Sequence, residues 1–182
     1  VRNAETNLGD LCADAYRALS NADIAFVNGG GIRKQIEAGD ITLDDIYSVH
    51  PFGNTMCVIR VTGQQVLDAL EWGARAVPSE NGGFLQVSGL TYEIHTGVAS
   101  SAEKDENGMF TRVSGEYRVK NVMVGGQPLE LDKTYTLASH NYMLLGHGDG
   151  YTMFDGCEVL GEDMMVDNQA VSYTHLTLPT IL

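Results

Sequence analysis

The chain has 182 residues, of which 43% are hydrophobic and 19% charged, as in an ordinary globular protein with one substantial core. Its 24 Asp and Glu against 11 Lys and Arg give a formal net charge of −13, which argues against nucleic acid or an anionic membrane as partner. The three cysteines form no Cys-x-x-Cys pair, and no run of about 18 apolar residues occurs, so a disulfide framework, a zinc site and a membrane span are not expected.

The first half of the chain predicts helices that alternate with strands. Apolar residues recur at helical spacing up to residue 19, and Thr6 or Asn7 can cap the helix that they define. Residues 24–27 are apolar throughout, as in a buried strand, and lead into three glycines. In chain order we expect a helix over 8–19, a strand over 23–28, short helices over 33–38 and 41–46, a loop over 49–54, a strand over 55–62 and an amphipathic helix that begins at Gly63.

The second half predicts strands, turns and a second glycine-rich cluster. We expect strands over 84–94 with a break near Gly89, an exposed and mobile loop over 97–115, a hairpin over 117–131 that turns at Gly125 and Gly126, and a strand over 134–139. These elements predict a single mixed α/β domain over residues 1–170, with mixed sheets and flanking helices.

The two ends of the sequence differ in character from the rest. Residues 172–182 contain no Asp, Glu, Lys or Arg, and we predict a non-native or disordered tail over 171–182. The sequence starts without Met and without a signal peptide, so we expect it to be a piece of a longer protein.

The run Asn-Gly-Gly-Gly-Ile-Arg at residues 28–33 follows the first predicted strand, where α/β sheets usually place their ligands. Glycine amides without a neighbouring Cβ are free to face an oxyanion, and the Arg33 guanidinium offers a planar fork suited to phosphate or carboxylate. Neither a Walker loop nor the Gly-x-Gly-x-x-Gly spacing is present. The run therefore predicts a phosphate cradle or, alternatively, only a tight turn.

Two further segments carry residues suited to ligand binding. A ring between Pro51 and Gly53 is either a rigidly presented stacking platform or part of the core. Asp149, between two glycines, either accepts hydrogen bonds from two sugar hydroxyls or stabilises a turn. His147 precedes it, but no set of His, Asp and Glu with ligand spacing accompanies it, so we expect no metal site in this chain.

Four motifs in collinear order carry a family resemblance: residues 2–9, 28–33, 51–54 and 148–151. Over residues 2–170 the chain resembles the C-terminal, substrate-binding domain of the 5′-nucleotidase and UDP-sugar hydrolase family. In that family a separate N-terminal metallophosphatase domain holds two divalent metal ions and performs the hydrolysis. The resemblance implies a domain that binds a nucleoside or nucleotide, holds no cofactor itself, and belongs to an extracellular, cell-surface or periplasmic parent protein.

The resemblance also implies roles for individual residues. Arg33 and Arg2 fall where the family holds the substrate phosphate, and Asn28 reaches the substrate from the same loop. Phe52 corresponds to the aromatic ring that stacks on the base, and Asp149 to the carboxylate that binds the ribose hydroxyls.

The remaining site residues follow from the same motifs. Gly30 and Asn54 belong to the expected substrate site. The family commonly has a second aromatic ring six residues before the ribose-binding Asp; here Met143 holds that position and Tyr142 precedes it, so either side chain completes the sandwich, with Tyr142 favoured. His147 stands where a glycine is usual.

Two other classes of function stay open. In the first, the chain is a non-catalytic binding or interaction module whose glycine loops are structural and whose Arg33 pairs with a carboxylate. Convergence of Arg33, Phe52 and Asp149 on one cleft would argue against it. In the second, the chain is an independent enzyme in which Cys57 or Cys157 approaches His50 in space.

Overall fold

The computed structural model describes the backbone of residues 1–177 and the side chains of residues 1–173. Its centre is a five-stranded sheet in the order β10-β2-β9-β1-β3, in which only β1 and β9 run parallel. The strands are β1 (Ile24–Asn28), β2 (Met56–Thr62), β3 (Leu85–Ser88), β9 (Thr134–His140) and β10 (Glu158–Gly161). This mixed architecture confirms the predicted fold class.

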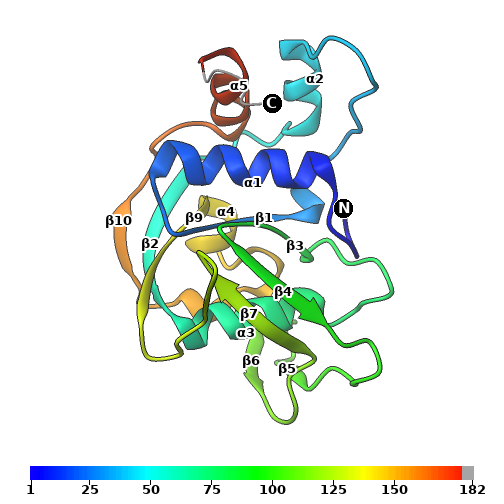
Figure 1. The fold of residues 1–182 in the computed structure, drawn as a ribbon, viewed down its shortest axis with the longest axis vertical. Coiled ribbons are helices and arrows are strands. Elements are labelled where there is room, and N and C mark those ends of the chain that lie inside the picture. The colour runs from blue at the N-terminus through cyan, green and yellow to red at the C-terminus, as the bar shows by residue number, and fades with distance from the viewer. Residues whose placement is uncertain (178–182) are drawn as a thin grey trace.

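Each face of the sheet covers its own hydrophobic core. In β1, Ile24 and Phe26 face one core, whereas Ala25 and Val27 face the other. This strand is buried along its whole length, which is why its sequence shows no alternation of apolar and polar residues. Figure 1 shows α1 (Asn7–Ser20), α2 (Leu43–Val49) and α5 (Asp167–Thr177) gathered on one side of the sheet. Helix α3 (Gly63–Ala74) and the strands of the smaller sheets lie on the other side.

The helices begin at residues that satisfy their first amides. Thr6 caps α1 (Asn7–Ser20), and Thr42 caps α2 (Leu43–Val49). Thr62 caps α3 (Gly63–Ala74) in a reciprocal arrangement with Gln65. The two remaining helices are α4 (Asn141–Leu144) and α5 (Asp167–Thr177). The helix predicted over 8–19 is thereby confirmed, and the strand over 55–62 with its following helix as well.

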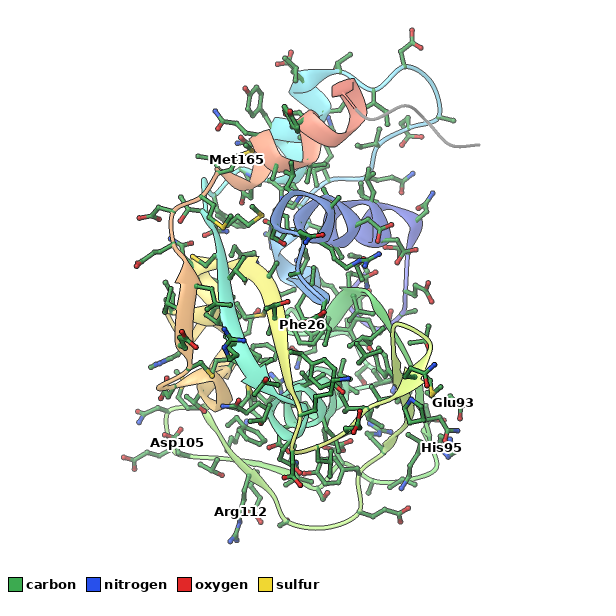
Figure 2. All side chains as sticks on the ribbon, turned by 60° about the vertical axis from the view of Figure 1, so that its left-hand side comes forward. Phe26, Glu93, His95, Asp105, Arg112 and Met165 are labelled. Atoms are coloured by element: carbon green, nitrogen blue, oxygen red, sulfur yellow. The ribbon has the colours of Figure 1, made fainter. Side chains whose placement is uncertain are left out.

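Two small sheets extend the lower half of the molecule. The strands β4 (Leu90–Ile94), β7 (Val119–Val124) and β8 (Gln127–Pro128) form one sheet, and β5 (Ala102–Lys104) pairs with β6 (Phe110–Val113) in the other. The prediction of a loop over 97–115 was wrong, because β5 and β6 form a hairpin there. This hairpin buries Phe110 against Trp72, with ring centroids 5.7 Å apart. Figure 2 shows Asp105 and Arg112 pointing outward from it, and these polar residues explain the error.

Other differences concern residues 33–38 and the C-terminal part of the chain. Residues 33–38 form no helix, because the Arg33 amide donates to the Val49 carbonyl (3.0 Å) and ties the start of the segment to α2. Strand β10 and helix α5 were not predicted. Helix α5 includes residues 171–177 of the proposed tail, and Val171 is fully buried; residues 178–182 lie outside the described residues.

Candidate functional site

A cavity of about 370 Å³ opens where the parallel strands β1 and β9 end. Carboxyl ends of parallel strands are the usual ligand site of α/β sheets, and this volume is typical of small-molecule sites. The cavity lining includes all eight residues selected from the sequence: Arg2, Asn28, Gly30, Arg33, Phe52, Asn54, Tyr142 and Asp149. Gly31 and Gly82, which the sequence analysis did not select, complete it.

The glycine run after β1 does not present a row of free amides. The Gly29 and Gly30 amides donate to the carbonyls of Phe84 and Gly82, each at 2.7 Å. A side chain at Gly29 would collide with the Val1 carbonyl, and one at Gly30 would lie 3.1 Å from the Gly82 carbonyl oxygen. The predicted oxyanion cradle is therefore wrong for these two amides, which instead dock neighbouring backbone segments.

The cationic residues of the cavity lining are Arg2 and Arg33. Arg33 is exposed, donates to the Gly30 carbonyl (3.1 Å), and its Cζ atom lies 5.6 Å from the centroid of the Phe52 ring. Within the described residues neither arginine forms an ion pair with a carboxylate. The alternative in which Arg33 pairs with a carboxylate of this acidic chain is therefore not supported within the described residues.

The cavity lining also contains the carboxylate of Asp149. Its Oδ2 atom accepts from the Asn28 side-chain amide at 2.6 Å, and its own backbone carbonyl accepts from the Trp72 indole at 2.9 Å. The Tyr142 hydroxyl lies 3.4 Å from Oδ1 and 3.3 Å from the Asp149 amide. Asp149 has φ 55°, a left-handed conformation that is uncommon outside glycine. These contacts hold its carboxylate in a defined direction.

Sequence comparison gives the family of this chain. The family described as "5'-nucleotidase, C-terminal domain" matches residues 1–156. The chain belongs to this family.

Relatives of the domain are parts of much longer proteins. The trifunctional nucleotide phosphoesterase protein YfkN of Bacillus subtilis is 38% identical over 90% of this chain and 11% of its own length. A 5'-nucleotidase of Vibrio parahaemolyticus is 37% identical over 85% of this chain and 24% of its own length. The crystal structure of a 5'-nucleotidase precursor from Thermus thermophilus superposes with a TM-score of 0.80 at 34% identity, covering 94% of this chain and 32% of that one.

In this 5′-nucleotidase C-terminal domain, the ring at the cavity beside Asp149 belongs to Tyr142. Tyr142 is 44% exposed and lines the cavity, whereas Met143 is fully buried in the core. The Tyr142 ring lies directly on Gly148, where any side chain would collide with it. Burial and the neighbouring Asp149 carboxylate raise the pKa of Tyr142, so its hydroxyl stays protonated.

Two residues behind the cavity were missed by the sequence analysis. His140, the last residue of β9, lies with Nε2 2.9 Å from the Asn28 Oδ1 atom. Asn141 accepts the Thr55 and Tyr142 amides on its Oδ1 atom, at 3.2 and 2.8 Å, and so links the two segments that carry the aromatic rings. One feature of the sequence could have pointed to His140: it is a polar residue at the buried end of the strand that includes Leu137 and Ala138.

The proposed cysteine–histidine enzyme is not supported by the geometry. His50 approaches neither Cys57 nor Cys157 but Cys12, with 3.1 Å between Nε2 and Sγ. His50 and Cys12 are buried, and burial raises the pKa of the Cys12 thiol to about 12. A protonated thiol without solvent access is no nucleophile.

The side chain of His147, within the second glycine cluster, contacts a carboxylate. His147 pairs with the Asp155 carboxylate at the surface. No cluster of three His, Cys, Asp or Glu side chains suited to a metal ion occurs in the described part of the chain. None of its described helices is both long and apolar enough to cross a membrane.

Proposed function

We propose that this domain recognises the nucleotide substrate of a 5′-nucleotidase-type phosphohydrolase. The observation that carries the proposal is the convergence of residues from four separate sequence motifs on one cavity, whose lining includes two arginines and a carboxylate. A nucleotide carries the three matching groups: an anion, a sugar diol and a base.

Arg2 and Arg33 hold the phosphate in this proposal. Guanidinium groups bind phosphate through paired, charge-assisted hydrogen bonds. The chain carries a net charge of −13, so an anion is attracted only where cations are concentrated locally. Two arginines without carboxylate partners in the described residues provide such a place.

Phe52 and Tyr142 bind the base, and Asp149 binds the ribose. An exposed aromatic ring stacks on any base because every base has a π face, which suits a domain that accepts several nucleotides. Asn28 and Asn54 lie beside these groups in the cavity lining and add hydrogen-bonding capacity.

Hydrolysis itself belongs to another part of the parent protein. We propose that an N-terminal metallophosphatase domain supplies two divalent metal ions, which activate the attacking water and stabilise the phosphate charge. The described residues of this chain offer no cluster of metal ligands, so the isolated domain is expected to bind nucleotides without cleaving them. We propose further that the parent protein acts outside the cytoplasm, which cell fractionation with an antibody to this domain would test.

Isothermal titration calorimetry of the isolated domain tests the proposal. AMP and adenosine are expected to bind, UDP-glucose serves as a third ligand, and Phe52→Ala is expected to weaken all three because each has a base to stack. Phosphate release should be undetectable. Absence of binding heat for every ligand, in the wild type and the variant alike, would refute nucleotide recognition.

A further inference from the structure

A series of two hydrogen bonds leads from the buried core to the Asp149 carboxylate in the cavity lining. It connects His140 on β9, Asn28 at the end of β1, and Asp149 in the turn Gly148–Gly150. Building on the proposed function, we propose that His140 is a positioning residue for sugar recognition, which orients Asp149 through Asn28 toward the two hydroxyls of a ribose.

The direction of every hydrogen bond in this chain follows from the chemistry of its ends. An ionised carboxylate only accepts, so the Asn28 group at 2.6 Å from Asp149 must be the NH₂. The Asn28 Oδ1 atom then faces His140, and an amide oxygen only accepts as well. The proton between them must therefore reside on Nε2 of His140.

The surroundings of His140 favour this neutral tautomer. His140 is 1% and Asn28 4% exposed, so water does not compete for either hydrogen bond. The Nδ1 atom of His140 has no hydrogen-bond partner among the described residues, as suits the nitrogen that lacks a proton. The neighbouring rings are those of Tyr16 on α1, 6.4 Å away in an edge arrangement, and Tyr142, 5.9 Å away. Burial lowers the pKa of His140 to about 4, so the imidazole is uncharged at neutral pH.

These hydrogen bonds leave the Asp149 carboxylate as an acceptor with a fixed orientation. Asn28 occupies one acceptor position on Oδ2, and the Tyr142 hydroxyl, 3.4 Å away, occupies one on Oδ1. Each oxygen keeps a further acceptor position, and Asp149 lines the cavity. Two adjacent hydroxyls are donors that match such a carboxylate. Without the Nε2 proton, the Asn28 amide loses the partner that fixes its rotation, and one of the contacts that orient the Asp149 carboxylate is weakened with it.

The test compares ligands that differ only in their hydroxyls. Adenosine and 2′,3′-dideoxyadenosine are titrated into wild type, His140→Leu and His140→Gln, with thermal melting as a check on folding. His140→Leu is expected to bind adenosine about tenfold more weakly, the loss of roughly one hydrogen bond's net contribution. Its binding of the dideoxy ligand should stay unchanged. His140→Gln keeps an N–H donor and is expected to recover most of the loss.

A general loss of structure predicts a different pattern. It would weaken both ligands equally, and that result would overturn the proposal, as would wild-type adenosine affinity in His140→Leu. Failure of the proposed function is distinct, because wild type would then bind neither ligand, and the positioning role would fall with it. Should His140→Leu not fold, ¹⁵N chemical shifts of the His140 ring in the wild type decide: a proton on Nε2 supports the proposal, and a proton on Nδ1 overturns it.

Discussion

The fold holds two sets of cavity residues with different firmness: Asp149 and Asn28, here called the sugar end, and Phe52 and Arg33, here called the open end. At the sugar end, Asp149 has partners for its carboxylate, its amide and its carbonyl, and Asn28 behind it is buried. At the open end, Phe52 is 59% exposed, and Arg33 is held by one hydrogen bond to a carbonyl and by its approach to Phe52.

The difference has its origin in the elements that carry these residues. Asn28 ends a strand buried on both faces. Phe52 lies on the turn between α2 and β2, next to Gly53 with φ 67°, and Arg33 opens a segment without regular structure. A preorganised carboxylate selects its ligand by geometry, whereas an exposed ring and an exposed cation select by stacking area and charge. Together with the proposed function, this difference predicts a domain that is strict toward the sugar and tolerant toward the base.

The largest expected effect is that of Asp149→Asn. Asparagine tolerates φ 55° well, so the turn should keep its shape while the carboxylate charge is removed. We expect adenosine affinity to fall about 100-fold, since hydrogen bonds to charged groups contribute about 1.5–3 kcal/mol each. Calorimetric titration measures it.

The dideoxy ligand provides the control for this variant. Binding of 2′,3′-dideoxyadenosine should be the same in Asp149→Asn and wild type, because no hydroxyl contacts are lost. If Asp149→Asn lost both ligands to the same extent, the carboxylate would shape the cavity instead of binding the sugar.

A smaller effect is expected in the pH dependence of stability, and it comes from the buried His140 behind Asn28. The pKa of His140 is about 4 in the folded chain against an ordinary 6.5, so between these values only the unfolded chain takes up its proton. Above about pH 6.5 His140 is neutral in both states and lowers the stability by nothing. As the pH falls from there toward 4, the free energy of unfolding decreases by up to about 1.4 kcal/mol per pH unit. His50, with a pKa of about 4, acts in the same direction, and Asp167, raised to about 6, acts in the opposite one.

Comparison with His140→Gln isolates the contribution of this histidine. Urea unfolding of both proteins at about pH 7 and about pH 5 should show a fall in the free energy of unfolding that is about 2 kcal/mol larger for wild type. Equal falls would mean that His140 is not held neutral by the fold.

Local sequence patterns together with the family resemblance pointed to residues that line the cavity, but not to the contacts behind them. The buried strand before the glycines and the Asp between glycines are local signals, and Asn28 at the end of that strand and Asp149 both line the cavity. The directions of the Gly29 and Gly30 amides depend on carbonyls at Phe84 and Gly82, far away in sequence. No local pattern contains that information.

Long-range pairing also explains the other omissions. The link between His140 and Asn28 joins β9 to β1, and the contact between His50 and Cys12 joins α2 to α1. Both arise only when the sheet and its helices assemble. The β5–β6 hairpin was missed for a related reason, since one buried ring, Phe110, anchors a segment that is otherwise polar.

The smallest effect is expected at the open end, from Arg33→Gln. An exposed cation contributes modestly and is screened by salt, so AMP affinity should fall about fivefold at low ionic strength and less in high salt. Adenosine, which lacks the phosphate, should bind as to wild type. Arg112→Gln is the matched control, because it removes the same charge from the β5–β6 hairpin, where Arg112 pairs with Glu103. If the two variants lowered AMP affinity equally, the effect would arise from net charge, and Arg33 would have no direct contact with the phosphate. A loss larger than that of Asp149→Asn would reverse the comparison and make the open end the selective one.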